Sequence, residues 1–467
     1  MKMTSFNDLF TDWFQPERCL AWAKRAGWYK RKGKIDPFEF LLSLVFGQLS
    51  TTERTLAAQA HSLSEPVSRQ AVEQRYSPAA VAYFQNAFQQ TMQASLNWQP
   101  ASPMAHQLEQ HFSALNLCDS TVLACDPSLA ALFPGCGGGG SAASIKVLLC
   151  YEYLQGRLNV LDLLPGKCSD QGKAQRVVQS IPRRGLGLFD AGFYHGTALQ
   201  ELQERGGYFV IPWPHNVSVW AQGNQGQWHR VNVAEHLRQT SETVVELSSV
   251  RLGTDQAGQL HAVRLVAYRL KEERANRRRA ALREKARTLG RTPTAEALEL
   301  AGWLMLITNA SAQKLPARVL GFLYRVRWQI ELVFKQFKSV LGLDSSDTTD
   351  ENRLQCEVWA RLLCGLLLFV WHSYANAACW FMHRREISFL KMAKRLQQEG
   401  RLLAQALGAG GTRLAETLVD LNRKILKLAR KEHQKSRQTT WQNLQEHWLD
   451  LIPNLQESPP AHAPAMT

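Results

Sequence analysis

Several signals that mark large protein classes are missing from this sequence. Its nine cysteines are odd in number and no two are spaced as Cys-x-x-Cys, which argues against a zinc ribbon and against a disulfide framework. Several of them stand in apolar stretches, where cysteine behaves as a small hydrophobe. The cysteine pattern fits a reducing compartment, so we expect a cytoplasmic protein.

Long apolar runs are also absent. The N-terminus carries an early acid, Asp8, and no apolar stretch of signal-peptide length, so we do not expect secretion. The most apolar segment, residues 362–371, has ten residues, whereas a helix needs about 20 to span a bilayer. Arg361 and His372 flank this segment. It therefore predicts a buried helix, and we expect no membrane partner.

The glycine-rich segment at residues 135–140 lacks the continuation that a nucleotide-binding loop requires. No Gly-Lys-Ser or Gly-Lys-Thr follows it, so it does not match a P-loop. We interpret it as a connection between strands and expect no nucleotide cofactor.

Positive charge, in contrast, is plentiful. The 467 residues include 55 Lys+Arg and 40 Asp+Glu, which gives a formal net charge of +15 and a pI near 9.5. Such a balance favours a polyanionic partner, either nucleic acid or an acidic membrane surface, although a basic protein without such a partner stays open on charge alone. The length suggests about three domains, and 45% hydrophobic residues can build a sizeable core.

Residues 1–105 have the pattern of a helical region. Within it, residues 55–77 predict two short helices on either side of Pro66, which is the layout of a helix-turn-helix. The second helix would carry donors for base edges and phosphates, among them Arg69 and Arg75. An ordinary helical hairpin is the alternative, and the two interpretations stand near parity. We expect an N-terminal DNA-binding region.

The hydrophobic period changes at about residue 112. Five strand-like runs, two of them separated by helical stretches, predict a mixed α/β sheet over residues 106–212. Residues 213–300 form an insertion that is partly β and ends in a basic helix at 271–291. The α/β pattern resumes over residues 301–350, with a strand at 303–308 and a helix at 315–341. Residues 351–453 are helical, and the proline-bearing tail 454–467 is expected to be disordered.

The helix at 271–291 carries nine basic residues against three glutamates. Such a helix could bind phosphates without sequence preference. A solvated surface helix is the alternative.

Two acids interrupt or end apolar strands. Asp119 stands inside the run Leu-Cys-Asp-Ser-Thr-Val, where an acid is costly without a partner or a metal. Asp190 ends the run Leu-Gly-Leu-Phe-Asp, and the turn Ala-Gly-Phe follows it. Both acids could hold a divalent cation, for which oxygen ligands are preferred. The alternative for each is a helix-cap or turn acid. Asp126, the nearest competitor of Asp119, precedes Pro127.

A third acid lies on a helix beside two cations. Tyr324, Arg327, Glu331 and Lys338 follow one another at offsets of 3, 4 and 7, which keeps them on one side of a helix. The opposite side is apolar and predicts a core contact. An acid between two cations suits metal binding next to phosphates. An amphipathic helix with ion pairs such as Glu331–Lys335 is the alternative.

The spacing Tyr324-x2-Arg327-x3-Glu331-x6-Lys338 resembles the signature of the DDE transposases of the insertion sequence four family. The Asp-Ser-Thr at Asp119 and the Asp-Ala-Gly-Phe at Asp190 resemble that family's two acidic motifs. The separations of 190 − 119 = 71 and 331 − 190 = 141 residues fit a ribonuclease-H-like core with an insertion before the last acid. The resemblance extends over residues 112–345.

The resemblance implies roles for particular residues. Asp119, Asp190 and Glu331 would be the catalytic acids and would bind two Mg²⁺ ions, for which Mn²⁺ may substitute. Tyr324, Arg327 and Lys338 would hold the phosphates at the transposon end.

A tryptophan is implied as well. In a relative, a tryptophan on the strand before the tyrosine motif stacks on a base flipped out of the duplex, and Trp303 stands on the matching strand. Packing of Trp303 under the sheet is the alternative. For Trp328 we expect a core position.

The function implied by the resemblance is that of a bacterial insertion-sequence transposase. It would bind terminal inverted repeats in double-stranded DNA, cut them in a metal-dependent reaction and transfer the resulting 3′-OH, acting as a homodimer on the nucleoid. Two alternatives stay open. One is a nuclease of the ribonuclease-H fold without strand transfer, and the other is a non-catalytic DNA-binding regulator that uses residues 55–77.

Overall fold

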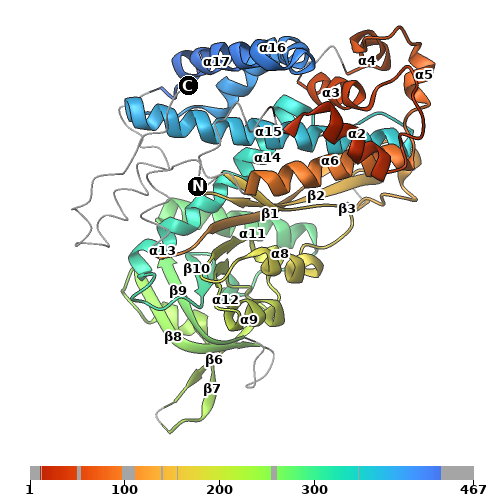
Figure 1. The fold of residues 1–467 in the computed structure, drawn as a ribbon. Coiled ribbons are helices and arrows are strands. Elements are labelled where there is room, and N and C mark those ends of the chain that lie inside the picture. The colour runs from red at the N-terminus through yellow and green to blue at the C-terminus, as the bar shows by residue number, and fades with distance from the viewer. Residues whose placement is uncertain are drawn as a thin grey trace.

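The computed structural model describes residues 11, 13–49, 54–96, 111–137, 140–154, 156–223, 225–253, 260–344 and 346–432. A layer of helices covers one face of a large twisted sheet (Figure 1). This layer combines both ends of the described chain, because the N-terminal helices α3 and α6 pack against the C-terminal helix α15. The tail at 454–467, for which disorder was expected, lies outside the described residues. The helices of this layer are α2 (Pro16–Arg25), α3 (Pro37–Gly47), α4 (Leu56–Ser62), α5 (Arg69–Glu73), α6 (Pro78–Leu96), α15 (Glu351–His383), α16 (Phe389–Ala409) and α17 (Gly411–Leu428).

Helix α15 contains the most apolar stretch of the chain. Its N-terminus is fixed by Asp350, whose carboxylate accepts a hydrogen bond from the Arg353 N–H at 2.6 Å. Among the described residues it is the one helix long and apolar enough to cross a membrane, but 94% of its most apolar window is buried inside the protein. Such burial is typical of the core helix predicted from the sequence.

The sheet has ten strands in the order β3-β2-β1-β4-β5-β10-β9-β8-β6-β7. Strands β1, β2 and β3 are antiparallel neighbours, whereas β4 runs parallel to β1 and β5 runs parallel to β4. This half of the sheet has the connectivity of a ribonuclease-H-like core, which confirms the predicted fold class. Its strands are β1 (Leu115–Cys125), β2 (Ala143–Glu152), β3 (Arg157–Pro165), β4 (Leu186–Phe189) and β5 (Tyr208–Pro212).

The other half of the sheet comes from the segment predicted as an insertion and from the strand that follows it. Strand β10 pairs with both β5 and β9, so the inserted strands continue the core sheet. In Figure 1 these strands occupy the end of the molecule opposite α16 and α17. The elements are β6 (Ser218–Gln222), β7 (Trp228–Val231), α10 (Val233–Arg238), β8 (Val244–Gly253), β9 (Leu260–Arg269), α11 (Glu272–Thr288), α12 (Ala295–Leu300) and β10 (Trp303–Thr308).

The two faces of the sheet support separate apolar cores, because side chains alternate along each strand. Leu117 and Val147 face the helical layer, whereas Cys118 and Leu148 face the opposite core. The helices α8 (Ala174–Ser180) and α9 (Gly196–Glu204) cover that second face. Asp119 therefore points to the same side as Leu117, toward the helical layer.

One disulfide joins neighbouring strands, although the cysteine pattern argues against a disulfide framework. Cys118 and Cys150 are directly opposite each other in the register of β1 and β2, and they form a disulfide with their Cα atoms 4.3 Å apart. Register between distant segments is not visible in sequence spacing, so the pair could not be identified there. The other seven cysteines are free, and Cys136 is exposed.

Candidate active site

Strands β1 and β4 bring Asp119 and Asp190 side by side. The parallel register pairs Leu117 with Leu188 and Cys118 with Phe189, so the next residues along the two strands are Asp119 and Asp190. Neighbouring strands are about 4.8 Å apart, which places the two backbones within reach of a shared ligand. Asp190 ends its strand and makes no capping hydrogen bond with the short 3-10 helix that follows, η3 (Ala191–Phe193). The capping alternative is thereby removed for Asp190.

The third acid lies on a helix that packs over β1. The predicted helix at 315–341 is divided into α13 (Ala317–Tyr324), a 3-10 turn η4 (Arg325–Arg327) and α14 (Trp328–Leu341). The 3-10 turn stands between Tyr324 and Glu331 and tightens the backbone there. The hydroxyl of Tyr324 donates a hydrogen bond to the Phe189 carbonyl at 3.2 Å, which fixes α13 to the end of β4 next to Asp190.

Arg327 connects the acids. Its guanidinium donates to Glu331 Oε1 at 2.6 Å and to Asp119 Oδ2 at 3.4 Å. The three side chains are 15%, 33% and 20% exposed, respectively, so they are partly shielded from water. Two acids that are 212 positions apart in the sequence therefore share one counter-ion.

The electrostatics of the cluster follow from burial and crowding. Burial raises the pKa of the Asp119 carboxyl to about 6; the Ser120 N–H and Arg327 oppose this rise, and the charges of Asp190 and Glu331 add to it. Burial alone would lower the pKa of Arg327, but the neighbouring Tyr324 and acids outweigh it and raise that pKa. Burial also raises the pKa of Tyr324. The site thus concentrates negative charge where water is partly excluded.

The donor set suits a hard divalent cation. Carboxylate oxygens are the ligands that such cations prefer, and crowded carboxylates that resist ionisation gain most from one. Within the described part of the chain no three His, Cys, Asp or Glu side chains already form a metal-binding group. Arg327 provides the positive charge between Asp119 and Glu331 instead.

The positions of the two tryptophans are the reverse of those expected. Trp303, expected to stack on a flipped base, is 1% exposed and packs in the second core, where its indole N–H donates to Glu299 Oε1 at 3.4 Å. Arg269 lies over its ring at 4.4 Å. Its ring is therefore not available to a base, and the core alternative is correct. Trp328, expected in the core, is 56% exposed directly after Arg327.

Lys338 lies on α14 about two turns beyond Glu331 and is half-buried. The structure gives it no contact with the three acids among the described residues. Its predicted role at phosphates stays a prediction.

The N-terminal candidates have separate positions. Arg69 begins the short helix α5 and is exposed, so it is accessible to a partner. Arg75, predicted on the same helix, lies beyond its end: its guanidinium stacks on Trp28 at 3.9 Å and donates to the Trp28 carbonyl at 3.4 Å. Arg75 is therefore engaged in the packing of the N-terminal region and does not point outward to DNA.

Sequence reasoning missed a polar group on the other side of β1. Asp170, in the loop before α8, accepts hydrogen bonds from Ser120 Oγ at 2.8 Å and from Lys146 Nζ at 3.1 Å. It also lies near Gly192, two residues after Asp190. Asp170 thus connects the loop that follows Asp190 with the residue that follows Asp119. A polar residue in a loop gives no sequence signal for such a contact.

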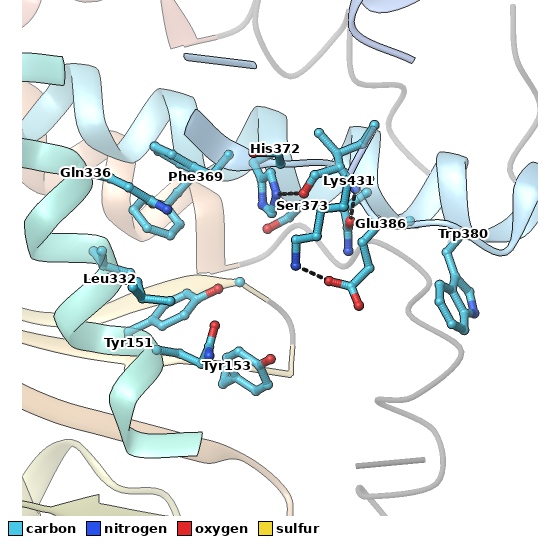
Figure 2. A pocket seen from close by; sticks show the side chains of 18 of the residues that line it. Tyr151, Tyr153, Leu332, Gln336, Phe369, His372, Ser373, Trp380, Glu386 and Lys431 are labelled. Carbon is cyan, nitrogen blue, oxygen red and sulfur yellow. Dashed lines mark hydrogen bonds and ion pairs between the residues drawn. The ribbon is translucent and has the colours of Figure 1, made fainter. Parts of the chain in front are cut away.

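A cavity of about 180 Å³ lies behind α14. Figure 2 shows Leu332 and Gln336 of α14 on one side and Phe369 and His372 of α15 on another. None of the three acids lines it. This cavity is therefore separate from the candidate active site.

Comparisons with known proteins identify the family of this chain. The sequence profile of the family described as "Transposase DDE domain" matches residues 111–367, a segment that contains all three acids. The chain is 24% identical over 400 residues to the transposase for insertion sequence element IS231F of Bacillus thuringiensis subsp. israelensis, with 83% of each protein covered. It is also 24% identical over 389 residues to the transposase for insertion sequence element IS1151 of Clostridium perfringens, with 79% of this chain and 80% of that protein covered.

Among solved structures, the fold is similar to the piggyBac transposase in its synaptic complex with hairpin DNA. The TM-score is 0.47 and the sequence identity 11%, over 97% of this chain and 86% of that chain.

Proposed function

This chain belongs to the transposase DDE domain family, and we propose that it moves a bacterial insertion sequence with Asp119, Asp190 and Glu331 as its catalytic acids. The observation that carries the proposal is the convergence of the acids: two are level on neighbouring parallel strands, and the third shares Arg327 with the first. Dependence on a divalent metal follows from the family, and we propose Mg²⁺ in particular.

The three carboxylates would hold two Mg²⁺ ions, which activate the attacking oxygen and stabilise the leaving oxygen in phosphoryl transfer. Water attacks the phosphorus at the end of the element, and the bond to the 3′ oxygen breaks, which leaves a 3′-OH and a 5′-phosphate. That 3′-OH would then attack a phosphodiester of the opposite strand or of target DNA, where the new bond to phosphorus replaces the bond to that strand's 3′ oxygen, which leaves as a second 3′-OH. The carboxylates would hold the metal ions, Arg327 would bind the scissile phosphate, and Tyr324 keeps α13 against β4 so that Asp190 and Glu331 stay aligned.

The remaining contacts with DNA are proposed from exposure and position. Trp328 presents an exposed ring next to Arg327 and can stack on a base, an interaction worth about 1–3 kcal/mol. Lys338 and Arg69 would bind phosphates. We further propose that residues 1–105 bind the inverted repeats. The core would comprise residues 106–212 and 301–350, with the insertion 213–300 between them. Residues 351–453 would form the interface of a homodimer that joins two transposon ends on the nucleoid in the cytoplasm.

The test uses duplexes that carry the short inverted repeats expected in the DNA beside the gene. The protein is expected to nick these ends in Mg²⁺ but not in EDTA. Asp119→Ala, Asp190→Ala and Glu331→Ala are each expected to abolish nicking. Asp126→Ala is the matched control, because Asp126 is a partly exposed acid just after the same strand as Asp119. Equal cutting by Asp190→Ala and the wild type would refute the assignment.

A second assay separates the transposase from a simple nuclease. A duplex with a pre-cleaved 3′-OH end is mixed with plasmid DNA, and joined products are counted. Joining that requires Glu331 supports strand transfer. Nicking without joining would mean that the chain is a nuclease of the same fold.

A further inference from the structure

The basic helix α11 (Glu272–Thr288) stands at the same edge of the sheet as the catalytic acids. Asp190 follows the carboxyl end of β4, and β5 ends at the same edge because it is parallel to β4. Strand β10 is antiparallel to β5, so its first residue, Trp303, lies at this edge. Trp303 pairs with Arg269, so the last residue of β9 lies at this edge as well. Helix α11 begins directly after β9.

The helix is fastened to this edge by its inner side chains. Arg278 Nη1 donates to the Trp303 carbonyl at 2.6 Å, and Arg279 Nε donates to the Leu298 carbonyl at 3.2 Å. Ala275 is the one fully buried residue of the helix. The remaining surface of α11 is exposed, so its other cations face solvent.

The strand register gives the separation between Asp190 and Trp303, the residue that Arg278 of α11 contacts. Leu188 pairs with Val210, and Pro212 pairs with Leu306. Asp190 is two residues after Leu188, so it is level with Pro212 and therefore with Leu306. Trp303 lies three residues beyond Leu306. Two strand spacings of about 4.8 Å and three residues of about 3.3 Å give roughly 14 Å along the sheet. At 3.4 Å per base pair this is about four base pairs of duplex. The same DNA molecule can therefore meet both places.

Several cations on α11 have no acidic partner. Arg277 and Arg287 pair with glutamates of the same helix, whereas Arg274, Arg283 and Lys285 form no ion pair among the described residues. Arg274 is also close enough to Arg278 to lower its pKa, although burial is the larger cause. At about 3.6 residues per turn, Arg274 and Lys285 lie on one side of the helix and Arg283 lies on the opposite side. Phosphates on either side of the helix would therefore meet cations that have no acidic partner.

We propose that α11 binds the phosphate backbone of duplex DNA a few base pairs from the scissile phosphate, with Arg274 and Lys285 on one side of the helix and Arg283 on the other as its contacts. The inference rests on the proposed function for the identity of the DNA. A helix of 17 residues is about 25 Å long, enough to follow roughly seven base pairs. Contacts of this kind are independent of sequence, so α11 holds the DNA in position and does not choose its site.

The experiment compares two triple variants by their salt-dependent binding to a labelled duplex of arbitrary sequence that is about 40 base pairs, or about four turns, long. The test variant is Arg274→Gln/Arg283→Gln/Lys285→Gln. The control is Lys394→Gln/Arg401→Gln/Arg413→Gln, which removes three exposed cations from α16 and α17 at the other end of the molecule. Each lost phosphate contact lowers the slope of log K against log salt by about 0.9, or about eightfold in affinity at 0.1 M salt relative to 1 M.

We expect the α11 variant to lose up to about 2.7 units of slope and the control to lose less than about one. An unchanged slope for the α11 variant, or equal losses in both variants, overturns the inference. Unchanged melting temperatures check that both variants are folded. Binding does not require cleavage. A wild-type protein that binds DNA but never nicks it would refute the proposed function, and the salt dependence of the two variants would still test whether α11 binds DNA.

A second measurement tests the position. An iron chelate attached to Lys285→Cys, in a Cys136→Ser background that removes the exposed cysteine, generates radicals that cut nearby DNA. On a duplex with an inverted-repeat end, cuts within about seven base pairs of the Mg²⁺-dependent nick are expected. Cuts only at remote positions overturn the inference.

Discussion

The strongest prediction concerns Arg327, the counter-ion that Asp119 and Glu331 share. Arg327→Gln keeps a side chain of similar length but removes the charge, so the carboxylates of Asp119, Asp190 and Glu331 face one another without compensation. We expect this variant to be less stable than the wild type when no divalent cation is present, and to recover most of the difference when Mg²⁺ is added.

The size of the effect follows from burial. Removing one partner of a fully buried ion pair costs about 3–5 kcal/mol, whereas an exposed pair contributes about 0–1 kcal/mol. Arg327 is 15% exposed and its two partners are 20% and 33% exposed, so the site lies between these limits. A loss of about 2 kcal/mol in the free energy of unfolding is expected near pH 8, where the acids are ionised.

Urea denaturation in EDTA and in millimolar Mg²⁺ measures this difference. The matched control is Arg238→Gln, which breaks an ion pair with Glu235 whose side chains are 49% and 44% exposed. The control is expected to change the free energy of unfolding by less than about 1 kcal/mol, and this change is expected to be the same with and without Mg²⁺. An equal deficit of Arg327→Gln in EDTA and in Mg²⁺ would show that the lost stability has nothing to do with crowded metal ligands, and the reasoning about this site would fail.

Three further predictions test the surroundings of the site. Burial lowers the pKa of His372, beside the cavity of Figure 2, to about 4, below the 6.5 of an unfolded chain. Protons therefore bind the unfolded state first, and stability falls as pH drops from about 6.5 to 4, by about 3 kcal/mol in total. His372→Asn is expected to remove this slope in urea melts, and an unaltered slope would exclude His372 as its source. At Gly365 on α15 a Cβ would lie 2.4 Å from Phe337 Cζ on the Glu331 helix, so Gly365→Ala is expected to lower stability by about 1–3 kcal/mol and to slow nicking. Gly408→Ala is the control, because a Cβ there meets nothing within 4 Å and alanine favours the helix. Asp170→Asn weakens the charge-assisted bonds to Ser120, on the strand that carries Asp119, and to Lys146 on the neighbouring strand β2. Slower nicking with unchanged DNA binding is therefore expected, and wild-type nicking rates would rule out a positioning role.

Part of this structure could be predicted because the signals are local. Asp119 and Asp190 stand out as acids in apolar runs, and those runs form β1 and β4. The apolar positions at helical spacing around Glu331 form the buried face of α14. In each case the period of the side chains decides the element, and the element decides which side an acid faces.

Other features depend on pairing between distant segments. Sequence spacing did not reveal that β10 joins the inserted strands to the core sheet, because strand register is fixed by tertiary contacts. The same limit explains the tryptophans. Trp303 and Trp328 both stand in apolar surroundings in the sequence, and only the packing against β9 and α12 buries Trp303. Arg75 likewise pairs with Trp28, 47 positions away.

Arg327 has consequences for the order of events at the site. A divalent cation bound to Asp119 and Glu331 would approach the carboxylate oxygens that accept hydrogen bonds from Arg327, and its positive charge would repel the guanidinium. Metal binding would therefore release Arg327 from its carboxylate partners while leaving it next to Asp119. A guanidinium in that position matches the geometry of a phosphate and is always charged. The residue that keeps the acids together without metal would thus become the residue that binds DNA once metal is present, which couples metal loading to substrate binding without any movement of the helices.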